Sequence, residues 1–195
     1  MKKLLLVLLT VCLLIVPVYA EEIADQPVKD EVQEDCVVVS TLDELQEAIA
    51  AADDGDIITI SCGIIIWQDN MVETDKNITL VRDDSFSAGP LFYMGRNGIL
   101  KGFNIIDTFG YKNTIEMQDS PSIQDCNFIG AENHYGYFIS VEKGVPELLD
   151  TVSITNCSFF DNGRSAISCG YGSDVICTGC TFTGNMSYSI DLLRK

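Results

Sequence analysis

Short apolar runs separated by glycine, asparagine, aspartate and proline make up most of the chain after Asp56. Runs of this kind are typical of β-strands joined by turns. Two stretches, "SITNCSFFDN" from residue 153 and "CTGCTFTGN" from residue 177, repeat Cys, Phe and Asn at a constant offset of 23 residues. A recurrence at this period indicates a solenoid in which each repeat forms one coil.

Six segments can be superposed on one shared apolar position, with successive spacings of 20, 20, 23, 31 and 23 residues. The superposed positions are Ile60, Leu80, Leu100, Ile123, Ile154 and Cys177. We interpret the long step, which contains residues 131–150, as one coil with an insertion of about eight residues. The sequence therefore predicts about six coils.

The columns of this superposition have a structural interpretation. Two residues after the shared position, the last four segments have residues that tolerate the left-handed backbone region of a sharp bend, namely Gly102, Asp125, Asn156 and Gly179. The next position holds Phe103, Cys126, Cys157 and Cys180, and two residues later come Ile105, Phe128, Phe159 and Phe182. Because alternate strand residues share a face and coils stack about 4.8 Å apart, we expect these side chains to fill the core.

An amphipathic segment precedes the strands. Residues 37–39 predict a short strand, and Ser40 or Thr41 is suited to cap a helix, with Asp43 or Glu44 placed for a capping box. One apolar face over residues 41–52 is formed by Leu42, Leu45, Ala48, Ile49 and Ala52. The sequence predicts a capping helix here, with Gly55 as its C-terminal cap.

The first 35 residues have a different composition. A basic start, an apolar run and a small-residue site ending at Ala20 predict a signal peptide over residues 1–20. Residues 21–35 contain seven acids and predict a disordered leader, so the β-helix domain is expected over residues 36–195. No other apolar run approaches the roughly 20 residues of a transmembrane helix. We expect a secreted or cell-surface protein without a membrane span; a periplasmic location stays open.

The net charge of the chain limits the kinds of partner that it can bind. Ten of the 12 basic residues and all 29 acidic residues follow Ala20, so the mature chain has a net charge of −19. Such a charge repels nucleic acid and anionic polymers, and we expect no nucleic-acid partner. No cofactor is expected, with calcium left open. The seven cysteines of the mature chain are an odd number and form a poor disulfide framework.

A capping helix followed by coils with "xIxNCxFxxN" phrases resembles the right-handed parallel β-helix superfamily, the pectate-lyase-like fold. The last two coils also resemble the repeats of chlamydial polymorphic outer-membrane proteins, whose FxxN motif matches residues 159–162 and 182–185. The resemblance covers about residues 37–195. It implies an all-β, single-stranded, right-handed parallel β-helix of about six coils with an N-terminal capping α-helix, on a scaffold that hosts many activities.

Several residues are candidates for catalysis or metal binding. Cys177 and Cys180 form a CxxC, for which we favour core filling over a disulfide between coils or a zinc site. Asp83, Asp84, Asp107 and Asp161 are the acids that a glycoside hydrolase or a lyase would use. The tripeptides that polygalacturonases carry on this fold are absent, so solvated turn acids are the better interpretation. Arg164 is expected to form a surface ion pair with Asp161 rather than to act as a base.

The segment "ENHYGYF" at residues 132–138 is the most distinctive local feature. Its ring faces on an exposed loop could stack on sugars, which predicts ligand binding by His134, Tyr135 and Tyr137. The alternative is that Tyr137 begins the next core strand. For Trp67, after three isoleucines, packing is favoured over binding.

These observations predict a non-catalytic, adhesin-like or carbohydrate-binding β-helix module. Its partners would be an extracellular glycan or a surface protein, and end-to-end self-association through the open C-terminal coil is a further expectation. The alternative is a small carbohydrate-active enzyme, either a polysaccharide lyase or a glycoside hydrolase.

Overall fold

The computed structural model describes residues 37–108, 110–132, 134–142, 151–170 and 173–192. The chain divides into two units, Met1–Asp35 and Cys36–Lys195, and every described element belongs to the second. The predicted signal peptide and acidic leader lie outside the described residues. Within the described part of the chain, no helix has the length and apolar character needed to cross a membrane.

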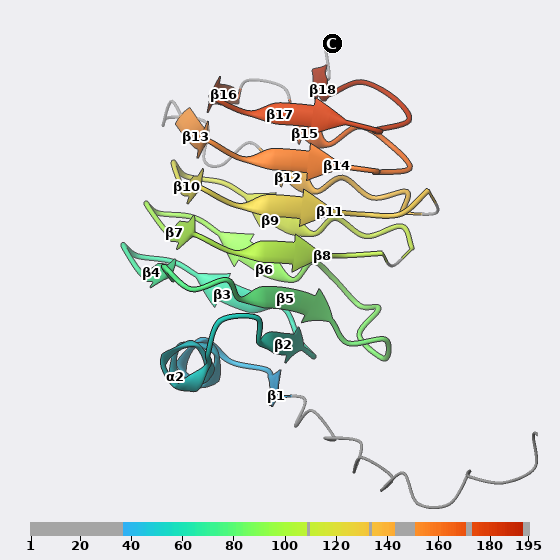
Figure 1. The fold of residues 1–195 in the computed structure, drawn as a ribbon. Helices are drawn as coiled ribbons and strands as arrows, with labels where there is room; N and C mark the ends of the chain where they lie inside the picture. Colours follow the sequence, from blue (N-terminus) through green and yellow to red (C-terminus); the bar gives the residue numbers. More distant parts are fainter. Residues whose placement is uncertain (1–36, 109, 133, 143–150, 171–172, 193–195) are drawn as a thin grey trace, which may run out of the picture. The chain divides into compact units, whose positions relative to one another are not determined.

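Three parallel sheets, each built from one strand per turn of the chain, form this unit (Figure 1). The first sheet contains β1 (Val37–Val39), β2 (Ile57–Ile60), β5 (Thr79–Arg82), β8 (Asn104–Ile106), β11 (Asn127–Ile129), β14 (Ser158–Phe160) and β17 (Thr181–Thr183). The second contains β3 (Ile64–Ile66), β6 (Phe92–Met94), β9 (Ile115–Met117), β12 (Ile139–Val141), β15 (Ile167–Cys169) and β18 (Ile190–Leu192). The third contains β4 (Met71–Glu73), β7 (Ile99–Lys101), β10 (Ser122–Gln124), β13 (Thr151–Thr155) and β16 (Asp174–Thr178). The predicted all-β parallel β-helix with an N-terminal helix is confirmed.

The register corrects the superposition of the first coils. Leu80 lies opposite Ile58 and Ile105 in the first sheet, whereas Leu100 lies opposite Val72 and Ile123 in the third. The prediction that Ile60, Leu80 and Leu100 share one column is therefore wrong. The early coils are unequal in length, and short apolar strands such as "IITI" and "TLVR" fit more than one alignment.

The later coils stack in the predicted register. Phe128 lies opposite Phe159, and Phe159 opposite Phe182, with ring centroids 4.9 and 5.0 Å apart and ring planes 9° from parallel. Aromatic pairs of this kind contribute about 0.5–1.5 kcal/mol each beyond the area they bury. The phenylalanine column is thus a continuous stack through three coils of the core.

The bend residues have the backbone conformation that their types predict. Gly102, Asp125, Asn156 and Gly179 all have positive φ, between 53° and 91°. The Asn156 side-chain amide donates to Asp125 Oδ1 over 3.1 Å, which connects two successive bends. At Gly102 an added Cβ would lie 2.1 Å from the carbonyl oxygen of Thr74, so this bend also needs glycine for space.

The cysteine column follows the bends into the core. Cys126 and Cys157 are fully buried, and their thiols donate to the carbonyl oxygens of Gln124 and Thr155 over 3.2 and 3.3 Å. Cys180, in the last coil, is half-buried. The thiol hydrogen bond with Cys126, together with burial, raises the pKa of Cys157 above its ordinary value. All six cysteines in the described residues are free thiols.

Helix α2 (Leu42–Ala51) packs against the first coil. Thr41 is its N-cap, and Thr41 and Glu44 form a capping box. The predicted C-cap is wrong: the cap is Ala52 in an extended conformation, and Gly55 lies in the turn beyond it. The reason lies in the next coil, because Lys76 Nζ donates to the carbonyl oxygen of Ala52 over 2.6 Å and satisfies the helix end without a glycine cap.

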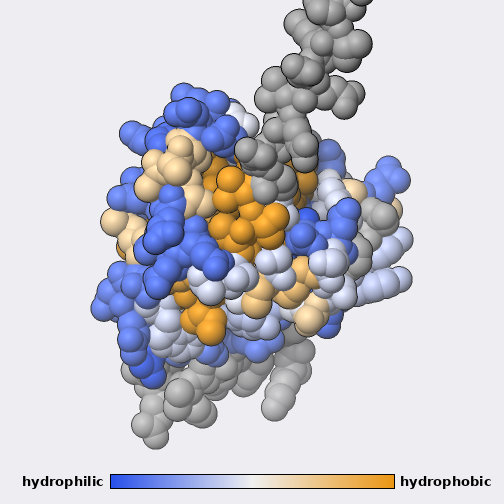
Figure 2. All heavy atoms as spheres, turned by 90° about the horizontal axis from the view of Figure 1, so that it is seen from below, coloured by the Kyte–Doolittle hydropathy of each residue, from blue (hydrophilic) through white to orange (hydrophobic). Residues whose placement is uncertain are grey.

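The two ends of the coil stack both expose apolar side chains. Figure 2 views the helix end, where apolar residues gather near the centre; the exposed ones from β1 and β2 include Val38 and Ile57. At the other end, Phe182 and Ile190 are only partly buried, because no described coil stacks on them. The core is therefore most complete in the middle coils.

Candidate functional site

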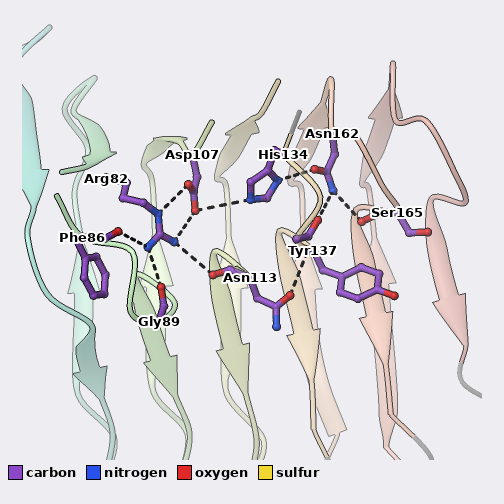
Figure 3. Close-up of polar contacts among 10 residues, drawn as sticks. Arg82, Phe86, Gly89, Asp107, Asn113, His134, Tyr137, Asn162 and Ser165 are labelled. Carbon is purple, nitrogen blue, oxygen red and sulfur yellow. Dashed lines mark hydrogen bonds and ion pairs between the residues drawn. The ribbon is translucent and has the colours of Figure 1, made fainter. Parts of the chain in front are cut away.

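Two groups of polar and aromatic side chains stand out, one inside the coils and one on their surface. We call the inner group the buried polar chain; it consists of Arg82, Asp107, His134 and Asn162 (Figure 3). We call the outer group the aromatic cleft; it is lined by Ile65, Trp67, Tyr93, Met94, Glu116, Met117, Gln118 and Glu142.

An ion pair begins the buried polar chain. Arg82, the last residue of β5, binds Asp107, just after β8, through two hydrogen bonds of 2.9 and 2.8 Å. The two side chains are 2% and 0% exposed. Arg82 also donates to the carbonyl oxygen of Gly89 over 2.7 Å. Because breaking such a buried pair by removing one partner costs about 3–5 kcal/mol, this pair holds the corner between two coils firmly.

His134 and Asn162 continue the chain into the next two coils. The Asn162 amide nitrogen donates to the carbonyl oxygens of Gly136 and Ser165 over 3.1 and 2.8 Å. Its oxygen, 2.6 Å from His134 Nδ1, therefore accepts, and Nδ1 carries a proton. His134 Nε2 points toward Asp107 at 4.0 Å and has no hydrogen-bond partner in the described part of the chain. The asparagine of one FxxN phrase thus has a structural role between coils.

This placement corrects the predicted loop at residues 132–138. His134 is fully buried and Tyr137 is 8% exposed, so neither ring face reaches a ligand in solvent. The segment is not an insertion: nine residues separate β11 from β12, against eight between β8 and β9. The extra length follows β12, where nine residues precede β13 against four between β9 and β10, and most of it lies outside the described residues.

Tyr135 is the exposed member of the predicted binding set. Its ring is 46% exposed and stacks on Tyr111, which is 82% exposed, with centroids 5.4 Å apart. The Tyr137 hydroxyl lies 3.3 Å from Asp191 Oδ2, and the Arg164 guanidinium lies over its ring at 4.2 Å. Arg164 therefore packs on an aromatic face, where an ion pair with Asp161 was predicted.

The four acids considered for catalysis do not lie together in one site. Asp83 and Asp84 line a cavity of about 460 Å³ beside β5 and β8. Hydrogen bonds from the side chain and backbone of Ser85 lower the pKa of Asp83, which favours the ionised carboxylate. Asp107 is fully buried in its ion pair, and Asp161 lies at a positive-φ bend in a later coil. Only the first two acids share a cavity accessible to a substrate.

The aromatic cleft is built on the outward face of the second sheet. Strand register places Ile65 opposite Tyr93, and Tyr93 opposite Glu116. Trp67 lies just beyond β3 and is only partly buried, so packing accounts for part of its surface. Its ring occupies the space left by Gly95, where an added Cβ would lie 2.5 Å from Cζ3, and Arg96 lies over the ring at 5.6 Å.

Polar groups continue the cleft beyond the rings. A cavity of about 240 Å³ joins Trp67 and Tyr93 to Glu116, Gln118 and Glu142. Burial raises the pKa of the Tyr93 hydroxyl, as do the negative charges of Glu116, Cys62 and Glu142. The cleft therefore combines two aromatic faces with amide and carboxylate groups. Sequence reasoning missed this cleft because its side chains come from four separate coils.

Metal binding has no candidate among the described residues, which contain no group of three or more His, Cys, Asp or Glu side chains suited to an ion. The expectation of no cofactor, with calcium left open, stays a prediction. Comparison of the chain with protein-family models, with curated proteins and with solved structures finds no match in any of the three.

Proposed function

We propose that this chain is a secreted or cell-surface carbohydrate-binding module that holds glycans in the aromatic cleft without cleaving them. The observation that carries the proposal is that Trp67 and Tyr93 line one cavity with Glu116, Gln118 and Glu142. Sugar rings present apolar faces to aromatic side chains and hydroxyls to polar ones, so a cleft of this composition suits them.

The rigidity of the scaffold supports this role. The cleft residues lie on or next to strands whose inward neighbours, such as Ile66 and Ile115, are fully buried in the core. A site on such strands changes little on binding, which lowers the entropic cost of association. The three parallel sheets also support our proposal that the chain belongs with the pectate-lyase-like β-helices.

Glycan binding is the direct test. The purified chain would be screened on a glycan array, and the best ligand titrated by calorimetry against Trp67→Ala and Tyr93→Ala variants. We expect each substitution to weaken binding about fivefold, since an aromatic contact contributes about 1 kcal/mol and about 1.4 kcal/mol is tenfold in affinity. Tyr188→Ala, at a residue 70% exposed and outside the cleft, is the matched control. If both cleft variants bind the glycan as tightly as the unmodified chain does, the aromatic cleft is not the binding site.

A second candidate function is supported by the cavity of Asp83 and Asp84. Two carboxylates in one cavity are the minimum set for a glycoside hydrolase. Reducing-sugar and unsaturated-product assays, with and without calcium, test this alternative on the same glycans. Turnover that disappears in Asp84→Asn would replace the binding proposal with an enzymatic one.

A further inference from the structure

The aromatic cleft has a charge of its own. Its smaller cavity is lined by two carboxylates, Glu116 and Glu142, and its described lining contains no basic residue. Arg96 lies beside the cleft, with its guanidinium 5.6 Å from the centroid of the Trp67 ring, but it is not part of this lining. The chain as a whole has a net charge of −17, so no distant positive field compensates the two glutamates.

The two glutamates occupy neighbouring coils beside the rings. Glu116 lies directly opposite Tyr93 on one side and Ser140 on the other, and Asn113 Nδ2 donates to its Oε1 over 3.3 Å. Glu142 follows β12, where its backbone N–H donates to Met117 of the preceding coil over 2.9 Å, and it is exposed. Both carboxylates line the same cavity as the Tyr93 ring, which places them at the aromatic end of the cleft.

A ligand that covers these carboxylates must replace their water. A neutral sugar offers only hydroxyl donors, and an acidic sugar adds a like charge, so each leaves part of the desolvation cost uncompensated. A protonated amino group forms charge-assisted hydrogen bonds with a carboxylate and is attracted to the faces of Trp67 and Tyr93. The chemistry of the cleft therefore matches a cation carried on a sugar ring.

We propose that the aromatic cleft selects glycans with free, protonated amino groups, which bind Glu116 and Glu142 while the sugar rings stack on Trp67 and Tyr93. This inference rests on the proposed carbohydrate-binding function and specifies its ligand class. Amino glycans bind most tightly, neutral and N-acetylated glycans less tightly, and polyuronates least.

The test uses three oligosaccharide probes of equal length: β-1,4-linked glucosamine, its fully N-acetylated form, and galacturonic acid. Calorimetry on the full chain at low salt should show the free amine binding at least about tenfold more tightly than the acetylated form, and the uronate not binding. Added salt should reduce the preference for the amine. Glu116→Gln and Glu142→Gln should each lower amine affinity toward that of the acetylated probe, whereas Glu47→Gln, on the exposed face of α2, should not.

The outcomes separate the two proposals. Equal affinity for the free and acetylated amines overturns the inference and leaves the carbohydrate-binding function standing. A preference for the amine that survives both cleft substitutions also overturns the inference, because it would then arise from net charge. Failure of all glycans to bind refutes the proposed function itself. Thermal unfolding of each variant checks that lost affinity is not lost structure.

Discussion

The buried polar chain and the aromatic cleft both contain polar side chains, but one group is enclosed by the core and the other borders solvent. Arg82 and Asp107 lie in the interior, where the pair and the backbone around it satisfy the guanidinium. Trp67 and Tyr93 lie on the surface, and Tyr93 is 39% exposed. In this solenoid the buried polar groups connect successive coils, and we propose that the polar groups of the cleft bind a ligand. Substitutions should therefore affect stability inside and binding outside.

The largest effect is expected at Asp107. Asp107→Ala leaves the Arg82 guanidinium buried without its carboxylate, which should lower the free energy of unfolding by about 3–5 kcal/mol. Urea unfolding followed by circular dichroism measures the change. The double variant Arg82→Met with Asp107→Leu is the control and should recover most of the loss, because no charge is then left unpaired. A single-variant loss below about 1 kcal/mol would contradict the role given to the ion pair.

An intermediate effect is expected at Asn162. Asn162→Leu removes the acceptor of His134 Nδ1 and the donors of two buried carbonyls, which should lower the free energy of unfolding by about 1–3 kcal/mol. The matched control is Asn185→Leu, the same position of the FxxN phrase in the last coil, where the side chain is only partly buried. Urea unfolding should show the smaller loss at Asn185. Equal losses of unfolding free energy would contradict the prediction that the more buried asparagine contributes more to stability.

The smallest effect on stability is expected in the cleft. Gly95→Ala places a Cβ against the Trp67 ring, all three of whose nearest atoms are within 2.8 Å of it, and should push the ring outward. Because Trp67 is the single tryptophan, its fluorescence reports this directly, and the emission maximum should move to longer wavelength. The free energy of unfolding should fall by about 1 kcal/mol, at the low end for overpacking, because Gly95 is buried but the Trp67 ring that must move is only partly buried. An unchanged emission spectrum would show that the ring does not depend on Gly95.

Features that depend on residues close together in the sequence were predicted correctly. The capping box of Thr41 and Glu44 depends on residues three apart, and the bends at Asp125 and Asn156 depend on one residue each. The register of the first coils was not predictable in this way, because Leu80 pairs with a residue 25 positions away and the intervening turns have no fixed length. A column of stacked side chains can be predicted from the sequence only where consecutive coils have equal lengths.

The candidate sites were harder to predict for the same reason. Arg82 and Asp107 each lie two residues after a core position, Leu80 and Ile105, so their pairing follows once the register is known. The aromatic segment at residues 132–138 predicts an exposed loop, yet His134 in it is fully buried. Trp67 followed three isoleucines and was assigned to packing, although it borders a surface cavity.

The sequence by itself determined that this chain forms stacked coils with glycine, asparagine or aspartate at the bends and a helix before them, since these features depend on neighbouring residues. The tertiary structure decided which polar groups are buried and which line a cleft. Residues more than twenty positions apart become neighbours only after the coils stack, and the exact turn lengths set which side chains then meet.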